Sequence, residues 1–227
     1  LDDLSRSKLT GSGPQDLPHR ISNDGVRGVT TNPSIFGAAI TGADEYAADI
    51  AALKGKSVDE VVRTLTTDDV RQACDLFAEI YQDSKGVDGR VSIEVDPRLA
   101  HKTQETISEG AALYTLVNRP NVMIKVPATK AGLPAITALI AQGISVNVTL
   151  IFSLERYGEV IDAFIEGIKL ADTGGKDLSQ IHSVASFFIS RIDSAVDKEL
   201  KALGNQELLG KIAIANAQRA YALFLEK

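Results

Sequence analysis

The sequence predicts an α/β protein built as a (β/α)8 TIM barrel, with only about six of the eight strand–helix units evident. Three observations predict this fold. Short β-branched apolar runs alternate with longer helical patterns, which indicates βαβ units and a parallel sheet. Polar residues fall late in several runs, at the strand ends that converge on a barrel mouth. The turn Thr31-Asn32-Pro33-Ser34 lacks the glycine-rich pattern of an open doubly wound sheet.

The predicted strands and helices follow one another along the chain. Leu1-Asp2 looks like the end of a first strand. The segment from Ile35 to Gly89 has helical patterns and no convincing strand, so we expect one elaborated helical connection within a single domain, residues 1–227. Five apolar runs predict strands, and 3.6-residue periodicity predicts the helices. The predicted strands are 28–31, 91–95, 122–126, 144–150 and 182–187, and the predicted helices are 104–116, 132–142, 154–170, 186–203 and 211–225.

The strand count predicts an incomplete barrel. Five strands and the stub Leu1-Asp2 make six units, and the chain ends in the helical pattern from Lys211 to Leu225. We therefore expect a chain truncated at both ends. An open sheet edge and bare apolar helix faces favour association or poor solubility, and little transferase activity is expected of such a piece.

Composition excludes several classes of function. The chain has 227 residues, 44% of them hydrophobic, a net charge of −6 and a pI near 5.1. This balance argues against nucleic acid and anionic membranes as partners, and no run approaches the length of a membrane helix. One local arginine can still hold a phosphate. Three histidines without ligand spacing argue against a metal site.

The single cysteine, Cys74, cannot form an internal disulfide and fits a reducing, cytoplasmic compartment. It lies in a helical pattern. A small core residue is the favoured interpretation and a nucleophile the alternative.

Lys125 is the most informative residue, because it interrupts the apolar run Val122-Met123-Ile124-Lys125-Val126-Pro127. A lysine in such a run loses hydration, which disfavours its charged form. A neutral amine can attack a carbonyl carbon and form a Schiff base. The alternative is a strand-end lysine whose stem carries the charge to solvent.

Two carboxylates could move protons for such a lysine. Glu94 lies late in an apolar strand, where burial would raise its proton affinity. Its alternative role is a structural partner of Lys125 or Arg98. Asp2 could be the second carboxylate, or the N-cap of a helix before Leu4.

Polar side chains at other strand ends could complete the site. Asn147 and Thr149 are two residues apart and share one face, where they could fix the lysine and a shuttle water. Thr149 is otherwise an ordinary β-former. Asn32 precedes Pro33 and is otherwise a turn residue.

Two further residues follow the last strand. Ser186 could line the mouth or cap the helix after it. Arg191 could meet a phosphate, or pair with Asp193 or Glu199 at the surface.

Five stretches in order resemble the transaldolase family, in particular its longer, actinobacterial-type branch. The resemblance covers the chain from Leu1 to the last helix, with 11–27 matching weakly. The stretches are Gly28-Val29-Thr30-Thr31-Asn32-Pro33-Ser34-Ile35-Phe36, Val91-Ser92-Ile93-Glu94-Val95-Asp96-Pro97-Arg98-Leu99, Met123-Ile124-Lys125-Val126-Pro127-Ala128-Thr129, Gly143-Ile144-Ser145-Val146-Asn147-Val148-Thr149-Leu150-Ile151-Phe152-Ser153 and Ser183-Val184-Ala185-Ser186-Phe187-Phe188-Ile189-Ser190-Arg191.

The resemblance implies a transfer of dihydroxyacetone that uses no metal or other cofactor, within the non-oxidative pentose phosphate pathway. The donor would be sedoheptulose 7-phosphate or fructose 6-phosphate, and the acceptor glyceraldehyde 3-phosphate or erythrose 4-phosphate. Lys125 would form the Schiff base, Glu94 would act through a water near Thr149, and Asp2 would handle the hydroxyl proton during carbon–carbon cleavage. The substrate-binding residues would be Asn32, Asn147 and Ser186 for the dihydroxyacetone hydroxyls and Arg191 for the phosphate.

Two competing functions stay open at this point. A simple aldolase would use free dihydroxyacetone on the same lysine, and a non-catalytic barrel would only bind sugar phosphates. The sequence also leaves open a homo-oligomer and a fused second activity beyond Lys227.

Overall fold

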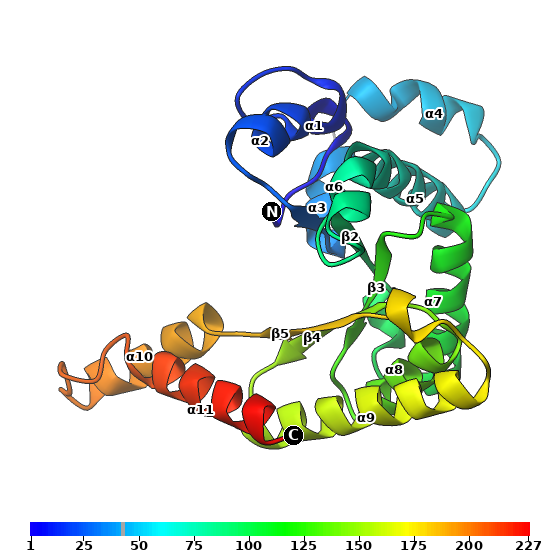
Figure 1. The fold of residues 1–227 in the computed structure, drawn as a ribbon. Helices are drawn as coiled ribbons and strands as arrows, with labels where there is room; N and C mark the ends of the chain where they lie inside the picture. Colours follow the sequence, from blue (N-terminus) through cyan, green and yellow to red (C-terminus); the bar gives the residue numbers. More distant parts are fainter. Residues whose placement is uncertain (42–43) are drawn as a thin grey trace. The chain divides into compact units, whose positions relative to one another are not determined.

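The computed structural model describes residues 1–41 and 44–227 as an α/β fold (Figure 1). Five strands lie in chain order, β1-β2-β3-β4-β5. Parallel strands in chain order with helices between them are the arrangement of part of a (β/α)8 barrel, so the predicted fold class is confirmed. The strands are β1 Gly28–Thr30, β2 Arg90–Glu94, β3 Val122–Pro127, β4 Val146–Ile151 and β5 Ser183–Phe187.

The helices agree with the predicted ones to within a few residues, except that α10 starts later than expected. Its predicted start falls in β5, where the backbone pairs with β4 instead. The α-helices are α1 Arg6–Thr10, α2 Leu17–Asn23, α3 Pro33–Ile40, α4 Ala47–Ala52, α5 Val58–Leu76, α6 Ala78–Asp83, α7 Thr103–Val117, α8 Gly132–Ala141, α9 Leu154–Thr173, α10 Ser190–Ala202 and α11 Ile212–Glu226, and the 3-10 helices are η1 Asp44–Tyr46, η2 Pro97–Leu99 and η3 Leu178–Gln180.

The chain divides into two compact units. The first holds residues 1–99 and 108–125, and the second holds residues 100–107 and 126–227. The predicted helical connection from Ile35 to Gly89 belongs to the first unit, and its described part contains helices and no strand. Residues 42 and 43 of that connection lie outside the described residues. The prediction that all of 1–227 is one domain stays a prediction.

In the first unit, β1 pairs with β2 and β2 pairs with β3, all parallel. The stub Leu1-Asp2 is not a regular strand, yet its backbone pairs with β1. The Thr30 N–H donates to the Leu1 carbonyl (2.8 Å), and the Leu1 nitrogen donates to the Gly28 carbonyl (2.8 Å). The stub therefore fixes Asp2 beside the end of β1.

One buried amide sets the entry into β3. The Asn121 side chain donates to the carbonyls of Cys74 (2.9 Å) and Gly89 (2.8 Å). It thereby joins the last turn of α5 to the residue before β2 and to the residue before β3. Because these bonds are buried, losing them would leave polar backbone groups unpaired, which fixes how β3 starts against β2.

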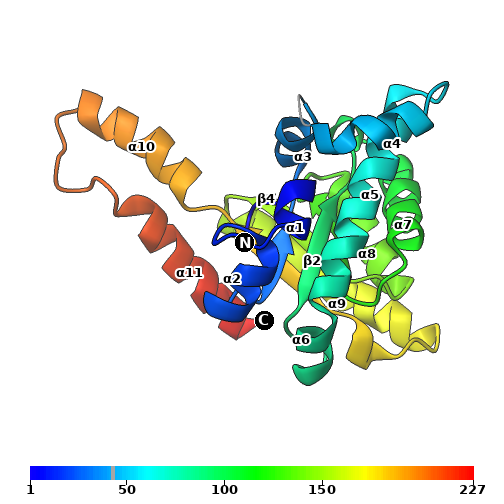
Figure 2. The same cartoon turned by 90° about the horizontal axis from the view of Figure 1, so that it is seen from above.

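Helix α5 covers β2, as Figure 2 shows. A capping box starts the helix, since the Ser57 and Glu60 side chains each bond the other residue's backbone N–H. Its buried face carries the apolar side chains that pack on the strand. These include Leu65, Val70, Ala73 and Cys74.

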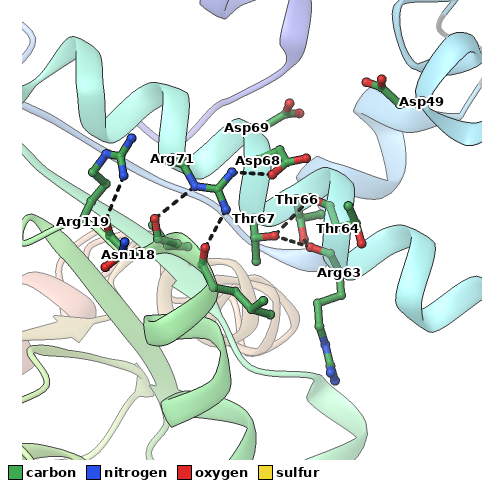
Figure 3. A network of polar contacts seen from close by, with 12 residues as sticks. Asp49, Arg63, Thr64, Thr66, Thr67, Asp68, Asp69, Arg71, Asn118 and Arg119 are labelled. Atoms are coloured by element: carbon green, nitrogen blue, oxygen red, sulfur yellow. Dashed lines mark hydrogen bonds and ion pairs between the residues drawn. The ribbon is translucent and has the colours of Figure 1, made fainter. Parts of the chain in front are cut away.

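Helix α5 also caps α7, which leads into β3 (Figure 3). The Arg71 guanidinium donates to the Leu116 carbonyl (2.6 Å) and the Val117 carbonyl (3.2 Å), and it pairs with Asp68 (2.5 Å). Terminal carbonyls of a helix have no partner within the helix. Arg71 supplies a hydrogen-bond donor for these carbonyls. It also places a positive charge at the C-terminal end of α7, the negative end of the helix dipole.

A buried network ties α1 to η1 and α5. The Tyr46 hydroxyl donates to Asp69 (2.6 Å), and the Arg6 Nε donates to the other Asp69 oxygen (3.0 Å). The Arg6 backbone N–H in turn donates to the Tyr46 hydroxyl (3.0 Å), and Arg6 also pairs with Asp49. Burial raises the pKa of the Asp69 carboxyl, although both hydrogen bonds oppose the shift.

In the second unit, β4 and β5 are parallel, and α8 packs on α9 (Figure 1). The register of β4 against β5 shifts between Val148 and Ile151, which marks a β-bulge or irregularity in β4. Leu150 lies within it and has a φ of 61°. A left-handed backbone at a branched side chain is strained, which marks this strand end as locally constrained.

Several large apolar side chains of this unit are exposed. Val184 on β5 is 47% exposed, and Leu225 on α11 is 67% exposed. These side chains leave apolar surface exposed on β5 and α11. The expected association or poor solubility stays a prediction. In the described part of the chain, no helix combines the length and apolar character needed to span a membrane.

The Arg71 cap generates a stability prediction. Arg71→Ala should lower the free energy of unfolding by about 1–2 kcal/mol, because it leaves two helix-end carbonyls without their charged donor. Urea denaturation measures the change. Arg119→Ala is the control, because Arg119 pairs with the exposed Asp75, and its effect should be smaller. Equal effects of the two variants would contradict the capping account.

Asp69 generates a pH prediction. Because burial raises its pKa above 3.8, the folded state holds the proton more often than the unfolded state in the window just above that value. Stability contributed by Asp69 therefore falls as pH rises through that window. The unfolding free energy of wild type minus that of Asp69→Asn should decline between about pH 3 and pH 6. A difference that rises with pH would show that Arg6 and Tyr46 outweigh burial. Asp68→Asn, on the same helix, controls for the loss of charge.

Candidate active site

Lys125 is buried, with its side chain 8% exposed. Its Nζ donates to the Thr31 carbonyl at 2.8 Å and lies 3.5 Å from Glu94 Oε2. The alternative of a strand-end lysine that reaches solvent is therefore wrong. The amine stays inside because two oxygen atoms replace the water that it loses.

Glu94 faces Lys125 because the strand register places the two side by side. Residues 91–94 of β2 pair in order with 122–125 of β3, which puts Glu94 opposite Lys125. Arg98, the alternative partner of Glu94, instead pairs with Asp96 and with Asp59 (2.9 Å). Glu94 is 14% exposed and lines a cavity. It thus combines contact with the amine and access to a ligand.

That cavity has a volume of about 560 Å³ and lies in the first unit. Its wall is mostly apolar, from α3, α5, β2 and α7. Glu94 and Asn32 both line it. The carboxylates on its wall outnumber the arginines, so the cavity is a poor place for a phosphate. The charged residues are Asp59, Arg63, Glu94, Asp96, Arg98 and Glu109.

Asn32 and Asp2 line a second cavity of about 500 Å³, also in the first unit. Asn32 is the N-cap of α3, since its Oδ1 accepts the Ile35 N–H at 2.9 Å. Asn32 therefore has a local structural role, as a helix cap at the junction of β1 and α3. Capping uses only its Oδ1, so the side-chain NH2 is not used by the cap. Asp2 is no helix cap, because Ser5 caps α1.

Asn147, Thr149 and Ser186 belong to the second unit. The Ser186 hydroxyl donates to Asn147 Oδ1 at 2.9 Å, so neighbouring strands hold these two side chains together. Ser186 lies in β5 and does not cap α10, whose N-cap position is Ile189. Asn147 and Thr149 are both buried on β4, and the Thr149 carbonyl accepts the Ala128 N–H at 2.8 Å.

Arg191 lies in the first turn of α10. Its guanidinium stacks over the Phe188 ring at 4.5 Å, and Phe188 stacks on Phe152 with 5.2 Å between ring centroids. Among the described residues, Arg191 forms no ion pair. The expected alternatives, Asp193 and Glu199, are therefore not its partners, and Asp193 instead accepts the Ala213 N–H at 3.2 Å.

The structure adds Thr31, which the sequence reasoning missed. Its backbone carbonyl accepts the Lys125 hydrogen bond, and its hydroxyl donates to the Ser92 carbonyl at 2.7 Å. The only signal in the sequence was its place at the end of a strand, next to Asn32. Backbone carbonyls are common to every residue, so residue type could not reveal this contact.

Cys74 lies in the core of the first unit. Burial raises the pKa of its thiol to about 12. Because the thiolate is the nucleophilic form, Cys74 is unreactive at neutral pH, and its interpretation as a core residue is confirmed. Within the described residues, no group of three or more histidine, cysteine and acidic side chains could hold a metal ion.

The first unit thus holds a buried lysine beside a strand-end glutamate. The sequence profile described as Transaldolase/Fructose-6-phosphate aldolase matches residues 1–227. The chain belongs to this family. The resemblance inferred from the five stretches is therefore confirmed.

Curated transaldolases of mycobacteria are similar to this chain along its whole length. Those of Mycobacterium tuberculosis (strain H37Rv) and Mycobacterium bovis (strain AF2122/97) are 55% identical over 231 residues, which cover 100% of this chain and 61% of theirs. That of Mycolicibacterium smegmatis is 56% identical over 232 residues, 100% of this chain and 62% of its own. The chain thus spans about three fifths of the length of these family members.

The Lys125–Glu94 pair generates a stability prediction. Glu94→Gln should lower the free energy of unfolding by about 1–3 kcal/mol, because the buried ammonium loses its counter-charge. Lys125→Met should leave stability within about 1 kcal/mol of wild type, or raise it, because Met fills an apolar strand site without a charge to desolvate. Urea denaturation of both variants measures this. A Lys125→Met protein less stable than Glu94→Gln would show that the pair serves the fold, not a reaction.

Proposed function

We propose that this protein is a transaldolase that works through a Schiff base on Lys125. It transfers a dihydroxyacetone unit from sedoheptulose 7-phosphate or fructose 6-phosphate to glyceraldehyde 3-phosphate or erythrose 4-phosphate, in the non-oxidative pentose phosphate pathway. The observation that carries the proposal is the buried Lys125 amine, 3.5 Å from the Glu94 carboxylate, in a chain of this family.

The chemistry follows from the amine. Neutral Lys125 attacks the ketose carbonyl carbon, and the resulting carbinolamine takes up a proton and loses water to give a cationic Schiff base. This cation takes up the electron pair released when the adjacent carbon–carbon bond breaks. The rest of the donor leaves as an aldose phosphate, while the three-carbon unit stays on Lys125. This unit then adds to the acceptor aldehyde, and hydrolysis of the Schiff base releases the product ketose phosphate.

Two residues, Glu94 and Asp2, move protons in this proposal, and Thr149 lies near the water that relays one of them. Glu94 passes a proton through a water held near Thr149 as the carbinolamine forms and dehydrates. A general acid or base must lie within hydrogen-bond reach of its proton, directly or through one water, and the position of Glu94 beside the amine supports this role. Asp2 accepts the hydroxyl proton whose loss accompanies bond cleavage, and its backbone position beside β1 supports this.

Four residues bind the substrate. Asn32, Asn147 and Ser186 hold the dihydroxyacetone hydroxyls, and Arg191 holds the phosphate. The Ser186–Asn147 hydrogen bond supports the proposal, because it holds the side chains of two of these residues together on neighbouring strands. Arg191 supports it because its guanidinium is exposed and not neutralised by a carboxylate among the described residues.

An aldolase that releases free dihydroxyacetone is the second candidate, because the family's own description includes fructose-6-phosphate aldolase. The same lysine and glutamate would serve both reactions. The binding-only alternative has no use for a buried amine beside a carboxylate. We place the reaction in the cytoplasm, since a buried free thiol at Cys74 suits a reducing compartment.

Borohydride trapping tests the lysine. With fructose 6-phosphate and borohydride, peptide mass spectrometry should find a dihydroxyacetone-sized adduct on Lys125, because hydride reduces a Schiff base to a stable secondary amine. Lys125→Met, predicted to fold, should give no adduct. An adduct on a different lysine, or none in a sample that binds the sugar, would contradict the proposal.

A product test separates transfer from simple cleavage. With fructose 6-phosphate and erythrose 4-phosphate together, a transaldolase makes sedoheptulose 7-phosphate, and the rate of donor consumption falls sharply without the acceptor. Chromatography of the sugar phosphates measures this. Free dihydroxyacetone formed equally with and without acceptor would favour the aldolase.

A further inference from the structure

We propose that Thr31 is a positioning residue, whose hydroxyl holds the backbone carbonyl that orients the nitrogen lone pair of Lys125. This inference rests on the proposed function, because it takes Lys125 as the nucleophile. It adds a residue outside the predicted set. Thr31 is fully buried, and its side chain does not touch the amine; its carbonyl does.

On its amino side, the residue Thr31 is held by one acceptor, the Ser92 carbonyl. Both the Thr31 N–H (3.2 Å) and the Thr31 hydroxyl (2.7 Å) donate to the Ser92 carbonyl. The backbone bond alone would leave the strand end free to rotate its next peptide. The second, shorter bond closes a small ring through the side chain and fixes the residue against β2.

On its carboxyl side, Thr31 is held by α3. The Thr31 carbonyl belongs to the peptide bond that joins Thr31 to Asn32, and Asn32 is the helix N-cap. Pro33 follows at the first helical position, where its ring fixes the backbone. With both ends held, the carbonyl points at Lys125 Nζ, 2.8 Å away.

Counting hydrogens on the nitrogen shows what this achieves. A neutral lysine amine has two N–H groups and one lone pair. Thr31 O and Glu94 Oε2 are two acceptors near Nζ, at 2.8 Å and 3.5 Å. When both N–H groups face these acceptors, the lone pair has only the third tetrahedral direction. In its neutral form the amine is then oriented for attack, which is how positioning lowers a barrier.

A purely structural role for the hydroxyl predicts a different result. In that case Thr31 would only stabilise the junction of β1 and α3, and losing the hydroxyl would lower the melting temperature without changing the reactivity of Lys125. The two roles are separated by measuring the reactivity of the amine itself. Thr31→Val keeps the β-branched shape and leaves the Ser92 carbonyl its bond from the Thr31 N–H, so the fold should persist.

The test is reductive methylation of the whole protein, followed residue by residue with peptide mass spectrometry. The Lys125 amine adds to formaldehyde, and the adduct takes up a proton from solvent and loses water to give an iminium ion, which cyanoborohydride reduces by supplying hydride. This reaction needs no sugar recognition. Thr31→Val should lower the limiting rate at high pH for Lys125 by about tenfold, the size that loss of one buried hydrogen bond gives. Exposed Lys102 should react at the wild-type rate.

Matched variants make the outcome specific. Thr31→Ser keeps the hydroxyl and should stay within about twofold of wild type. Thr67→Val should also stay within about twofold, because it removes an equally buried hydroxyl that donates to the Arg63 carbonyl (2.8 Å), away from the amine. If Thr31→Val does not fold, Thr31→Ala against Thr31→Ser gives the same comparison, since these two differ only by the hydroxyl.

Three comparisons of the methylation rate would each overturn the proposal: a wild-type limiting rate in Thr31→Val, a Thr31→Ser protein as slow as Thr31→Val, or equal slowing by Thr67→Val. A change in the midpoint of the pH profile with an unchanged limiting rate also overturns it, because that is an effect on charge and not on orientation. Slowed methylation in Thr31→Val with no fructose 6-phosphate adduct in wild type would sink the proposed transaldolase and leave Thr31's positioning intact.

Discussion

The buried contact between Lys125 and Glu94 is the constraint on which the first unit depends. An ammonium inside an apolar strand needs acceptors, and here they are one carboxylate oxygen and one backbone carbonyl. Both come from neighbouring strand ends, so the β2–β3 register decides whether the amine is satisfied. A one-residue slip would turn Lys125 to the opposite face. The Asn121 bonds and the Arg71 cap, which fix the start of β3, therefore also support the site.

Burying the Lys125 amine lowers the stability of the fold, while it places a reactive group at the end of a strand. A strand whose residues are all buried would be more stable with an apolar side chain at its centre, and the desolvation of Lys125 is only partly offset by a carboxylate at 3.5 Å. Such a cost is typical of a reactive group held ready for its substrate. The strained Leu150 in β4 and the cap that Asn32 makes on α3 lie at other strand ends. Local constraint thus gathers at the ends of the strands, where the predicted site residues lie.

Much of this could be predicted from the sequence, because apolar runs and their spacing record burial directly. The five strands, the helical segment after β1 and the proximity of Glu94 to Lys125 all follow from such patterns. Contacts that depend on where a strand or helix begins or ends could not be predicted from these patterns. Ser186 was as consistent with a cap as with the strand position that bonds Asn147. The sequence was consistent with Asp2 as a helix N-cap, but Ser5, three residues later, is the N-cap of α1. Thr31 was missed because its contact uses a carbonyl that every residue has. The catalytic and binding roles remain proposals.

The most direct test of the central claim is a crystal structure of the protein soaked with fructose 6-phosphate at the pH of reaction. The account predicts continuous electron density from Lys125 Nζ to the C2 carbon of the donor. It also predicts that the Glu94 carboxylate lies within hydrogen-bond reach of that carbon's oxygen or of a water beside it. Sugar bound with clear space between C2 and Nζ, or bound away from β3, would contradict the account.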